Sequence, residues 1–525
     1  MKKLLLSLLA VLACAPWLLL PAQAQGQAPT RTAAELPPVP PREAAPGDTA
    51  QWRRLVLFNG IKVLLLSDAR LNVSSAALVV GVGSLADPPG RQGLAHFLEH
   101  MLFLGTEKFP DPIGFDAYLR RNGGVHNAYT ADDRTNYFLE IRHEAFEGAL
   151  DRFAQFFVAP LFDARFTERE MNAVASEHQK NLENDSWREH QVRKTAFAPG
   201  HPARHFGTGS RETLAGVTRD ELLDFYRRHY SANRMALVLT GRAGLDQLEA
   251  WARRHFGAVP DRQLPPLAYP ADYLPPKPAL RLLQVEPIKD LRHLHLHFPL
   301  PGLHDGWPHK SAELLGFILG GEGPGSLLAH LKAEGLATSL SAGAQAATAQ
   351  YGAFELQVGL TPQGLQQVPR VLQLVFSKVQ LLREQGLPPQ LFGERRTLAQ
   401  LDERYRDKGE GANLAAGLAS LVTDHPLAVA ERVPFLWLRE DPAAFRALLD
   451  RLVPDNLLVT LVAKGVATDR TEPHYGTRYS YAEDTGAALA ALRQPPRVAA
   501  LQLPRPNPFV PARTTLQALQ PARLI

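Results

Sequence analysis

Short apolar runs along the chain carry the pattern of β-strands. They are rich in Val and Leu, or they alternate apolar with polar positions, as segments of a pleated sheet do. The predicted strands are 62–68, 74–84, 235–240, 292–298 and 457–462. A further segment, 127–141, predicts a hairpin that turns at Asp132 and Asp133.

Longer segments repeat their apolar residues every three to four positions, which predicts amphipathic helices. They are 92–105, 143–157, 167–193 and a helix–glycine turn–helix at 311–335. For 167–193 we expect a capping box, with Thr167 as the cap and Glu170 three residues on. Strands and helices in mixed order predict an α+β fold, with mixed or antiparallel sheets and helices packed on one side.

Proline-rich segments divide the chain, because proline lacks a backbone donor and seldom lies inside helices or central strands. We expect a lead-in at 25–47, a linker at 260–279 and a C-terminal tail at 495–525. The parts between them, 48–259 and 280–494, are called the first and second body.

The two bodies share a local pattern. Asn233 and Asn456 stand in matching loop-to-strand segments, 223 residues apart. Together with the linker spacing, this pair favours a tandem duplication. The predicted architecture is therefore two homologous α/β-sandwich domains in tandem.

Residues 1–24 have the form of a secretory signal peptide. Lys2 and Lys3 precede an apolar core, and a small-x-small site ends at Ala24. We expect cleavage after Ala24 and a periplasmic or secreted protein. Lipidation at Cys14 is the weaker alternative, because the residues after it stay apolar. No later segment offers 18 uncharged apolar residues, so we expect no membrane association after the signal is removed.

Composition narrows the possible chemistry. A hydrophobic content of 45% with 21% charged residues describes a globular chain with a large core. The formal net charge is +4 without a clustered Lys/Arg run, which predicts no nucleic-acid partner. The single cysteine lies in the predicted leader, so any metal in the mature chain must be bound by His and carboxylate.

The segment "HFLEH" places two histidines and a glutamate inside an apolar run. On a helix, His96 and His100 project from one face, one turn apart, so both imidazoles can bind one Zn²⁺. Zinc lowers the pKa of bound water to about 7, and a neighbouring carboxylate can take the proton. Glu99 leans toward that face, so the segment predicts a zinc site with Glu99 as general base.

A third ligand must come from elsewhere, since catalytic zinc usually has three protein ligands and one open position. Glu177 and His178 are the candidates, and Glu170 lies two turns from Glu177 on the same helix side, where it can orient a histidine. The alternative is a chance H-x-x-E-H string on a solvated stripe. The surrounding apolar residues argue against it, because buried polar groups need partners.

H-x-x-E-H is the inverted zincin arrangement. Further motifs accompany it from about residue 50 to about residue 510. They are "GLAHFLEHMLFLGTEKFP", "HNAYTADDRTNYFLEI", "ALDRFAQFFVAPLF", "REMNAVASEHQKNLENDSWR", "HPARHFGTG", "GGEGPGSLLAHLKAEG" and "RTEPHYGTRY". In content, order and spacing the chain resembles the pitrilysin and insulin-degrading enzyme family of zinc peptidases.

The resemblance implies a role for each residue of the site. His96, His100 and Glu177 match the zinc ligands. Glu99 matches the general base, and Glu170 matches a supporting acidic residue near the metal.

The resemblance also implies two regions that bind substrate. Asn127 and Ala128 match an edge strand to which peptides add as an extra strand. The second-body surface that anchors a substrate N-terminus in relatives is matched by Gly320, Glu322, Leu340 and Gly343. Ala342 and Ala344 stand where relatives often have Gly and Gln, which would weaken that surface.

Single-chain relatives have two halves of two domains each, which close like a clamshell. This sequence ends near the crossing into the second half, so the resemblance implies half of a clamshell metallopeptidase. The second-half arginine and tyrosine that support the reacting carbonyl would then be missing. We expect a separately encoded second-half subunit; self-association and a weakly active truncated half are the alternatives.

The function predicted is a zinc endopeptidase that cuts short or unfolded peptides. The alternative is a non-catalytic peptide-binding or assembly subunit with structural zinc. A second histidine group, His293, His295 and His297, lies on one face of a predicted strand. We interpret it as a partly exposed strand face rather than a metal site, because no carboxylate is spaced to complete a ligand set.

Overall fold

The computed structural model describes residues 38–512. The predicted signal peptide, the lead-in up to residue 37 and the end of the tail from residue 513 lie outside the described residues. No helix among residues 38–512 is long and apolar enough to cross a membrane.

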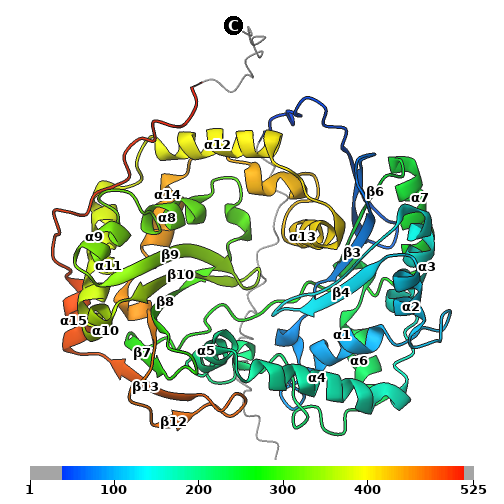
Figure 1. The fold of residues 1–525 in the computed structure, drawn as a ribbon, viewed down its shortest axis with the longest axis horizontal. Coiled ribbons are helices and arrows are strands. Elements are labelled where there is room, and N and C mark those ends of the chain that lie inside the picture. The colour runs from blue at the N-terminus through cyan, green and yellow to red at the C-terminus, as the bar shows by residue number, and fades with distance from the viewer. Residues whose placement is uncertain (1–37, 513–525) are drawn as a thin grey trace, which may run out of the picture. The chain divides into compact units, whose positions relative to one another are not determined.

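The first body contains a six-stranded mixed sheet (Figure 1). Its strands are β1 (Gln51–Val56), β2 (Lys62–Ser67), β3 (Ser74–Val80), β4 (Val125–Thr130), β5 (Thr135–Ile141) and β6 (Met235–Gly241). Their order is β1-β2-β6-β3-β5-β4, with β2 and β6 parallel and the other pairs antiparallel. The predicted hairpin at Asp132 and Asp133 is confirmed by β4 and β5, which leaves β4 as a free edge.

Helices cover one face of this sheet and enclose the main core of the first body. They are α1 (Leu94–Leu102), α2 (Gly114–Arg121), α3 (Phe146–Val158), α6 (Arg219–His229) and α7 (Leu245–Phe256). Strand positions alternate between the two faces, so Val63, Leu65 and Leu78 meet these helices while their neighbours point to the other side.

The segment 167–193 forms two helices where the sequence predicted continuous helical periodicity. They are α4 (Thr167–Asn181) and α5 (Asp185–Lys194). Asn184 causes the break, because its extended backbone ends one helix while its side chain caps the next by accepting from Ser186 N at 3.0 Å. The predicted cap at Thr167 is wrong: a 3₁₀ turn capped by Asp163 runs directly into α4, so Thr167 is already helical.

The second body repeats the plan with a seven-stranded sheet. Its strands are β7 (Leu280–Val285), β8 (Arg292–Pro301), β9 (Ala337–Ala346), β10 (Tyr351–Leu360), β11 (Leu458–Ala463), β12 (Arg470–Thr471) and β13 (Arg478–Asp484), in the order β12-β13-β7-β11-β8-β10-β9. The late strand β11 enters the middle of the sheet parallel to β7, as β6 does beside β2 in the first sheet. Asn233 and Asn456 lie in 3₁₀ turns directly before these two inserted strands.

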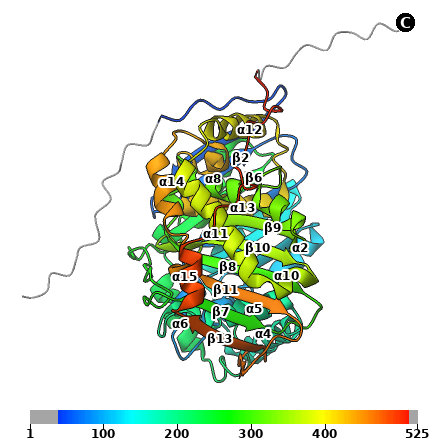
Figure 2. The same ribbon diagram turned by 90° about the vertical axis from the view of Figure 1, so that its left-hand side faces the viewer.

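Helices α11 and α15 of the second body pack on the outer face of its sheet (Figure 2). The helices of this body are α8 (Ser311–Leu319), α9 (Leu327–Ala333), α10 (Pro362–Gln366), α11 (Val368–Gln385), α12 (Leu391–Tyr405), α13 (Gly411–Asp424), α14 (Pro442–Leu449) and α15 (Ala487–Arg493). Residues 260–279, the predicted linker, contain no helix or strand.

Each body sends one helix to the open face of the other body's sheet. Helix α13 packs on β3, β5 and β6, opposite the side that α2, α3 and α7 cover (Figure 1). Its Ala415, Ala419 and Val422 meet Ala77 and Val238. In return, α5 packs on the second sheet, with Val192 in one buried cluster with residues of β7 and β11. The exchange thus covers, in each sheet, the face on which the helices of the same body do not pack. The α+β fold class is confirmed.

The histidine stripe on β8 faces α5, and His293 and His295 are partly exposed, as predicted. The premise that no carboxylate lies near the stripe is wrong. His293 Nε2 and His295 Nδ1 lie 2.8 and 3.0 Å from the carboxylate of Glu189, and His297 Nδ1 lies 2.9 Å from Glu355. Burial alone would raise the pKa of Glu189, but the bonds to His293 and His295 hold it well below its usual range. The stripe is part of a polar contact between the bodies.

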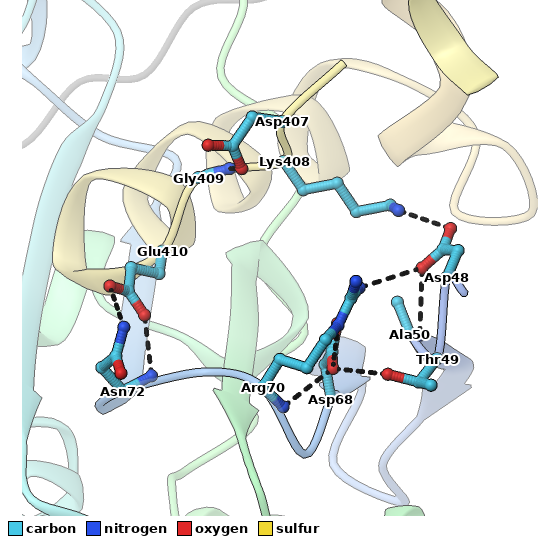
Figure 3. Close-up of polar contacts among 10 residues, drawn as sticks. All are labelled: Asp48, Thr49, Ala50, Asp68, Arg70, Asn72, Asp407, Lys408, Gly409 and Glu410. Carbon is cyan, nitrogen blue, oxygen red and sulfur yellow. Dashed lines mark hydrogen bonds and ion pairs between the residues drawn. The ribbon is translucent and has the colours of Figure 1, made fainter. Parts of the chain in front are cut away.

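A second polar contact fixes the loop that leads from α12 into α13 (Figure 3). Lys408 pairs with Asp48 of the first body. The carboxylate of Glu410 accepts from Asn72 N at 2.7 Å and from Asn72 Nδ2 at 2.8 Å. These contacts, called the 408–410 latch, hold the start of α13 beside the loop that joins β2 to β3.

Candidate metal centre

The start of α1 is held by groups outside the helix. Gly93 has φ +90°, and a Cβ there would lie 2.2 Å from Gly209 Cα, so only glycine fits. The N-cap residue is Gly93, which has no side chain to cap the helix. Instead the carboxylate of buried Asp87 accepts from Gly93 N at 2.7 Å and from Ala95 N at 2.8 Å. A carboxylate at this place satisfies free N–H groups and interacts favourably with the helix dipole. The direction in which α1 presents its polar face is therefore set by tertiary contacts.

The three predicted ligands converge beside α1. His96 Nε2 lies 3.5 Å from Glu177 Oε2, and His100 Nε2 lies 3.8 Å from Glu177 Oε1. One ligand atom from each residue can be chosen so that all lie within 4.8 Å of one another. Within residues 38–512 no other group of three or more His, Cys, Asp or Glu residues meets this condition.

The two imidazoles are oriented through their other nitrogens. His96 Nδ1 lies 2.7 Å from the carbonyl oxygen of Thr208, and His100 Nδ1 lies 3.4 Å from Glu170 Oε2. Both contacts favour a proton on Nδ1, which leaves the Nε2 lone pairs directed at Glu177. Burial would raise the pKa of Glu170, but its contacts with His100 and Arg169 lower it overall. The predicted supporting residue is thus an ionised partner of His100.

This donor set fits a divalent metal such as zinc. Two neutral imidazole nitrogens and one carboxylate form a three-ligand site that leaves a coordination position open. Glu177 is half exposed, with 50% of its side-chain surface accessible, so this side of the donor set faces away from the core.

Glu99 lies next to the ligands and is held by a different bond. It is 6% exposed, and Thr130 Oγ1 donates to Glu99 Oε2 over 2.6 Å. Burial raises the pKa of the Glu99 carboxyl, against the opposing effects of His96 and Thr130. A raised pKa favours proton uptake by this group. Thr130 was missed by sequence reasoning; its position at the end of the β4 edge strand was the available signal.

The metal ligands open onto a cavity of about 1040 Å³. Asn127 and Ala128 line it from β4, the outermost strand of the first sheet. The inner strand β5 pairs with one side of β4 only. The other side of β4 can accept an added strand, as the sequence resemblance implied for this position.

The other four predicted substrate residues do not lie at the metal. Gly320, Glu322, Leu340 and Gly343 line an adjoining cavity of about 1180 Å³ in the second body. The two cavities share Ala346 and Asp424 in their linings.

Three family models match the chain, and they agree with one class of protein. "Insulinase (Peptidase family M16)" matches residues 62–200, which include every predicted metal ligand. "Peptidase M16 inactive domain" matches 216–398, and "Middle or third domain of peptidase_M16" matches 404–523. The chain belongs to the M16 (insulinase/pitrilysin) family of peptidases and corresponds to the N-terminal half of its long members.

Individual members of this family show how similar the chain is to them and how much of their length it covers. The chain is 38% identical over 485 residues to the human insulin-degrading enzyme, which covers 91% of this chain and 48% of that protein. It is 37% identical over 473 residues to the A-factor-processing enzyme of Saccharomyces cerevisiae, covering 88% and 46%. The crystal structure of pitrilysin superposes with a TM-score of 0.86 at 30% identity, covering 91% of this chain and 51% of that one. The chain thus spans about half the length of these relatives.

Proposed function

We propose that this chain is a zinc-dependent endopeptidase that cuts short or unfolded peptides. One observation carries the proposal: the Nε2 atoms of His96 and His100 and the Glu177 carboxylate meet beside Glu99, at the free edge of β4. Metal ligands, a base and a strand-binding edge are the parts that peptide hydrolysis needs in one place.

Zinc bound at His96, His100 and Glu177 would acidify water and polarise a peptide carbonyl. Glu99 is placed to accept the proton of the attacking water and to give it to the leaving amine. Thr130 keeps the Glu99 carboxylate in one orientation during both transfers. Backbone bonds to β4 hold a peptide with little regard to its sequence, which suits short or unfolded substrates.

We further propose that another polypeptide completes the cavity beside the metal. Supporting this, the relatives are about twice as long as the chain. A separately encoded second-half subunit is favoured over self-association, because the metal ligands and Glu99 are all present in this chain. The signal-like residues 1–24 support action in the periplasm or outside the cell.

The test combines metal analysis with peptide cleavage. Wild type and Glu99→Gln are purified, their zinc content is measured, and hydrolysis of a quenched fluorescent peptide is followed with and without a second-half protein. We expect one zinc per chain in both proteins and cleavage by wild type alone. Zinc-loaded wild type that never cleaves in any combination would favour the non-catalytic peptide-binding subunit. Equal rates for both proteins would remove Glu99 from the role of base.

A further inference from the structure

Two sequence motifs without an assigned role meet beside the metal centre. They are "HPARHFGTG", which contains the loop 206–209, and "RTEPHYGTRY", which contains the turn 472–477 between β12 and β13 of the second body. The ring of His474 stacks on Phe206, with 4.1 Å between centroids and 13° between planes. Phe206 is 1% exposed, so this contact is part of a packed interface.

The loop 206–209 sets the orientation of His96. The carbonyl oxygen of Thr208 lies 2.7 Å from His96 Nδ1. Two residues earlier, Phe206 N donates to the Gln92 side chain at 2.8 Å, just before α1 begins. Movement of Phe206 would therefore displace both the start of α1 and the carbonyl that orients its first histidine.

The same turn also holds the helix that carries Glu177. His178 follows Glu177 on α4, and His178 Nε2 lies 2.8 Å from the carbonyl oxygen of His474. The His178 ring packs edge-on against Phe206 at 5.1 Å and against Tyr475 at 5.2 Å. His178, which sequence reasoning considered as a ligand, thus contacts the second body instead of the metal.

The turn is itself rigid enough to act as a support. The carboxylate of Glu472, 1% exposed, accepts from His474 N at 3.0 Å and from Tyr475 N at 2.7 Å. Glu472 N in turn donates to the carbonyl oxygen of Thr477 at 2.8 Å. Arg188 of α5 adds a bond to the carbonyl oxygen of Tyr475 at 2.8 Å. These bonds fix the backbone of the turn on both sides of His474.

We propose that the turn 472–477 is a positioning element for the metal centre. It holds His96 through Phe206 and Thr208, and it holds Glu177 through His178. The second body, which supplies no ligand, thereby determines how two of the three ligands face each other. The inference rests on the proposed metal site, and it follows the general rule that partners of ligands control metal affinity.

The test measures metal binding in the full chain rather than catalysis. His474→Ala removes the ring that stacks on Phe206, and His474→Phe retains an aromatic ring. The zinc dissociation constant is measured by competition with a chromophoric chelator, and the Co²⁺-loaded proteins are compared by visible absorption. We expect His474→Ala to bind zinc about 10-fold more weakly with an altered Co²⁺ spectrum. We expect His474→Phe to lie within about twofold of wild type.

The control removes a different contact between the bodies. Glu410→Ala removes the carboxylate that accepts from Asn72 in the 408–410 latch, a contact that includes no metal ligand (Figure 3). We expect it to lower the melting temperature while leaving the zinc dissociation constant and the Co²⁺ spectrum unchanged. His178→Phe, which keeps a ring but loses the bond to His474, serves as a second variant and should also weaken zinc binding.

Three outcomes would overturn the inference. His474→Ala and His178→Phe could both bind zinc as wild type does. Glu410→Ala could weaken zinc binding as much as His474→Ala, which would mean that any loosening of the two bodies suffices. Wild type that binds no zinc at all would instead remove the proposed metal site, and this result differs from the other two because it needs no variant.

Discussion

Replacing Thr130 by valine tests how the proposed base is held. The substitution keeps the branched shape of the side chain but removes the hydroxyl that donates to Glu99 Oε2 over 2.6 Å. Glu99 is 6% exposed, so water cannot readily replace the lost donor. Hydrogen bonds to charged groups contribute about 1.5–3 kcal/mol net. If this bond acts in the transition state, its loss corresponds to a decrease in kcat of roughly 10- to 100-fold.

The assay is steady-state cleavage of a quenched peptide by zinc-loaded protein, in the combination of subunits that gives wild-type turnover. We expect Thr130→Val to lower kcat while KM stays within about twofold, because Thr130 orients the base and not the peptide. Zinc content should be unchanged, since Thr130 contacts none of the ligands. Thr130→Ser keeps the hydroxyl and is the matched control. A kcat for Thr130→Val within twofold of wild type, or an equal loss in Thr130→Ser, would show that packing alone orients Glu99.

Three further predictions concern stability. Removing metal with a chelator should lower the melting temperature of wild type but not of His96→Ala. The reason is that a ligand that binds only the folded state stabilises it, by about 2.7 kcal/mol at 100 times its Kd. Equal shifts in melting temperature for the two proteins would contradict a metal site at His96. Burial lowers the pKa of Lys378 from 10.5 to about 8. Between these two pH values the folded chain therefore binds fewer protons than the unfolded chain. The free energy of unfolding should then increase as pH rises, by up to about 3 kcal/mol. The melting temperature of wild type relative to Lys378→Met should therefore increase from pH 7 to pH 10, and a constant difference would refute this. Gly93→Ala combines φ +90° with a clash at Gly209 and should lower the free energy of unfolding by about 2–4 kcal/mol. Gly386→Ala has φ +74° but open space around it, and should lower this free energy by about 1 kcal/mol. Similar melting temperatures for the two variants would exclude the clash.

Local patterns in the sequence were enough to predict strands β2 to β6, β8 and β11 and helices α1, α3 to α5, α8 and α9, which include the candidate metal helix. The spacing of His96 and His100 follows from helix geometry, so their common face could be derived from the sequence alone. The third ligand could not be derived from local spacing, because 77 residues separate His100 from Glu177 and no local period connects them. It came from the resemblance to a family, and the structure brings the three side chains together.

The failures concern contacts between distant segments. The Thr130–Glu99 bond depends on how the β4–β5 hairpin sits over α1, which neither segment encodes by itself. The carboxylate partner of His293 and His295 was missed because Glu189 lies on α5, about 100 residues earlier in the chain. The Thr167 cap failed for a more local reason, since Asp163 already caps the preceding turn.

The exchange of α5 and α13 has a consequence for biosynthesis. The last strand of the first sheet ends at Gly241, but the helix that covers its open face ends at Asp424. At 5–20 residues per second, a ribosome needs roughly 10–40 s to make the residues between them. During that interval the nascent chain presents an uncovered face that includes Leu64, Val79 and Val238. We therefore expect this stage of translation, rather than the finished fold, to be the point at which the chain depends most on a chaperone.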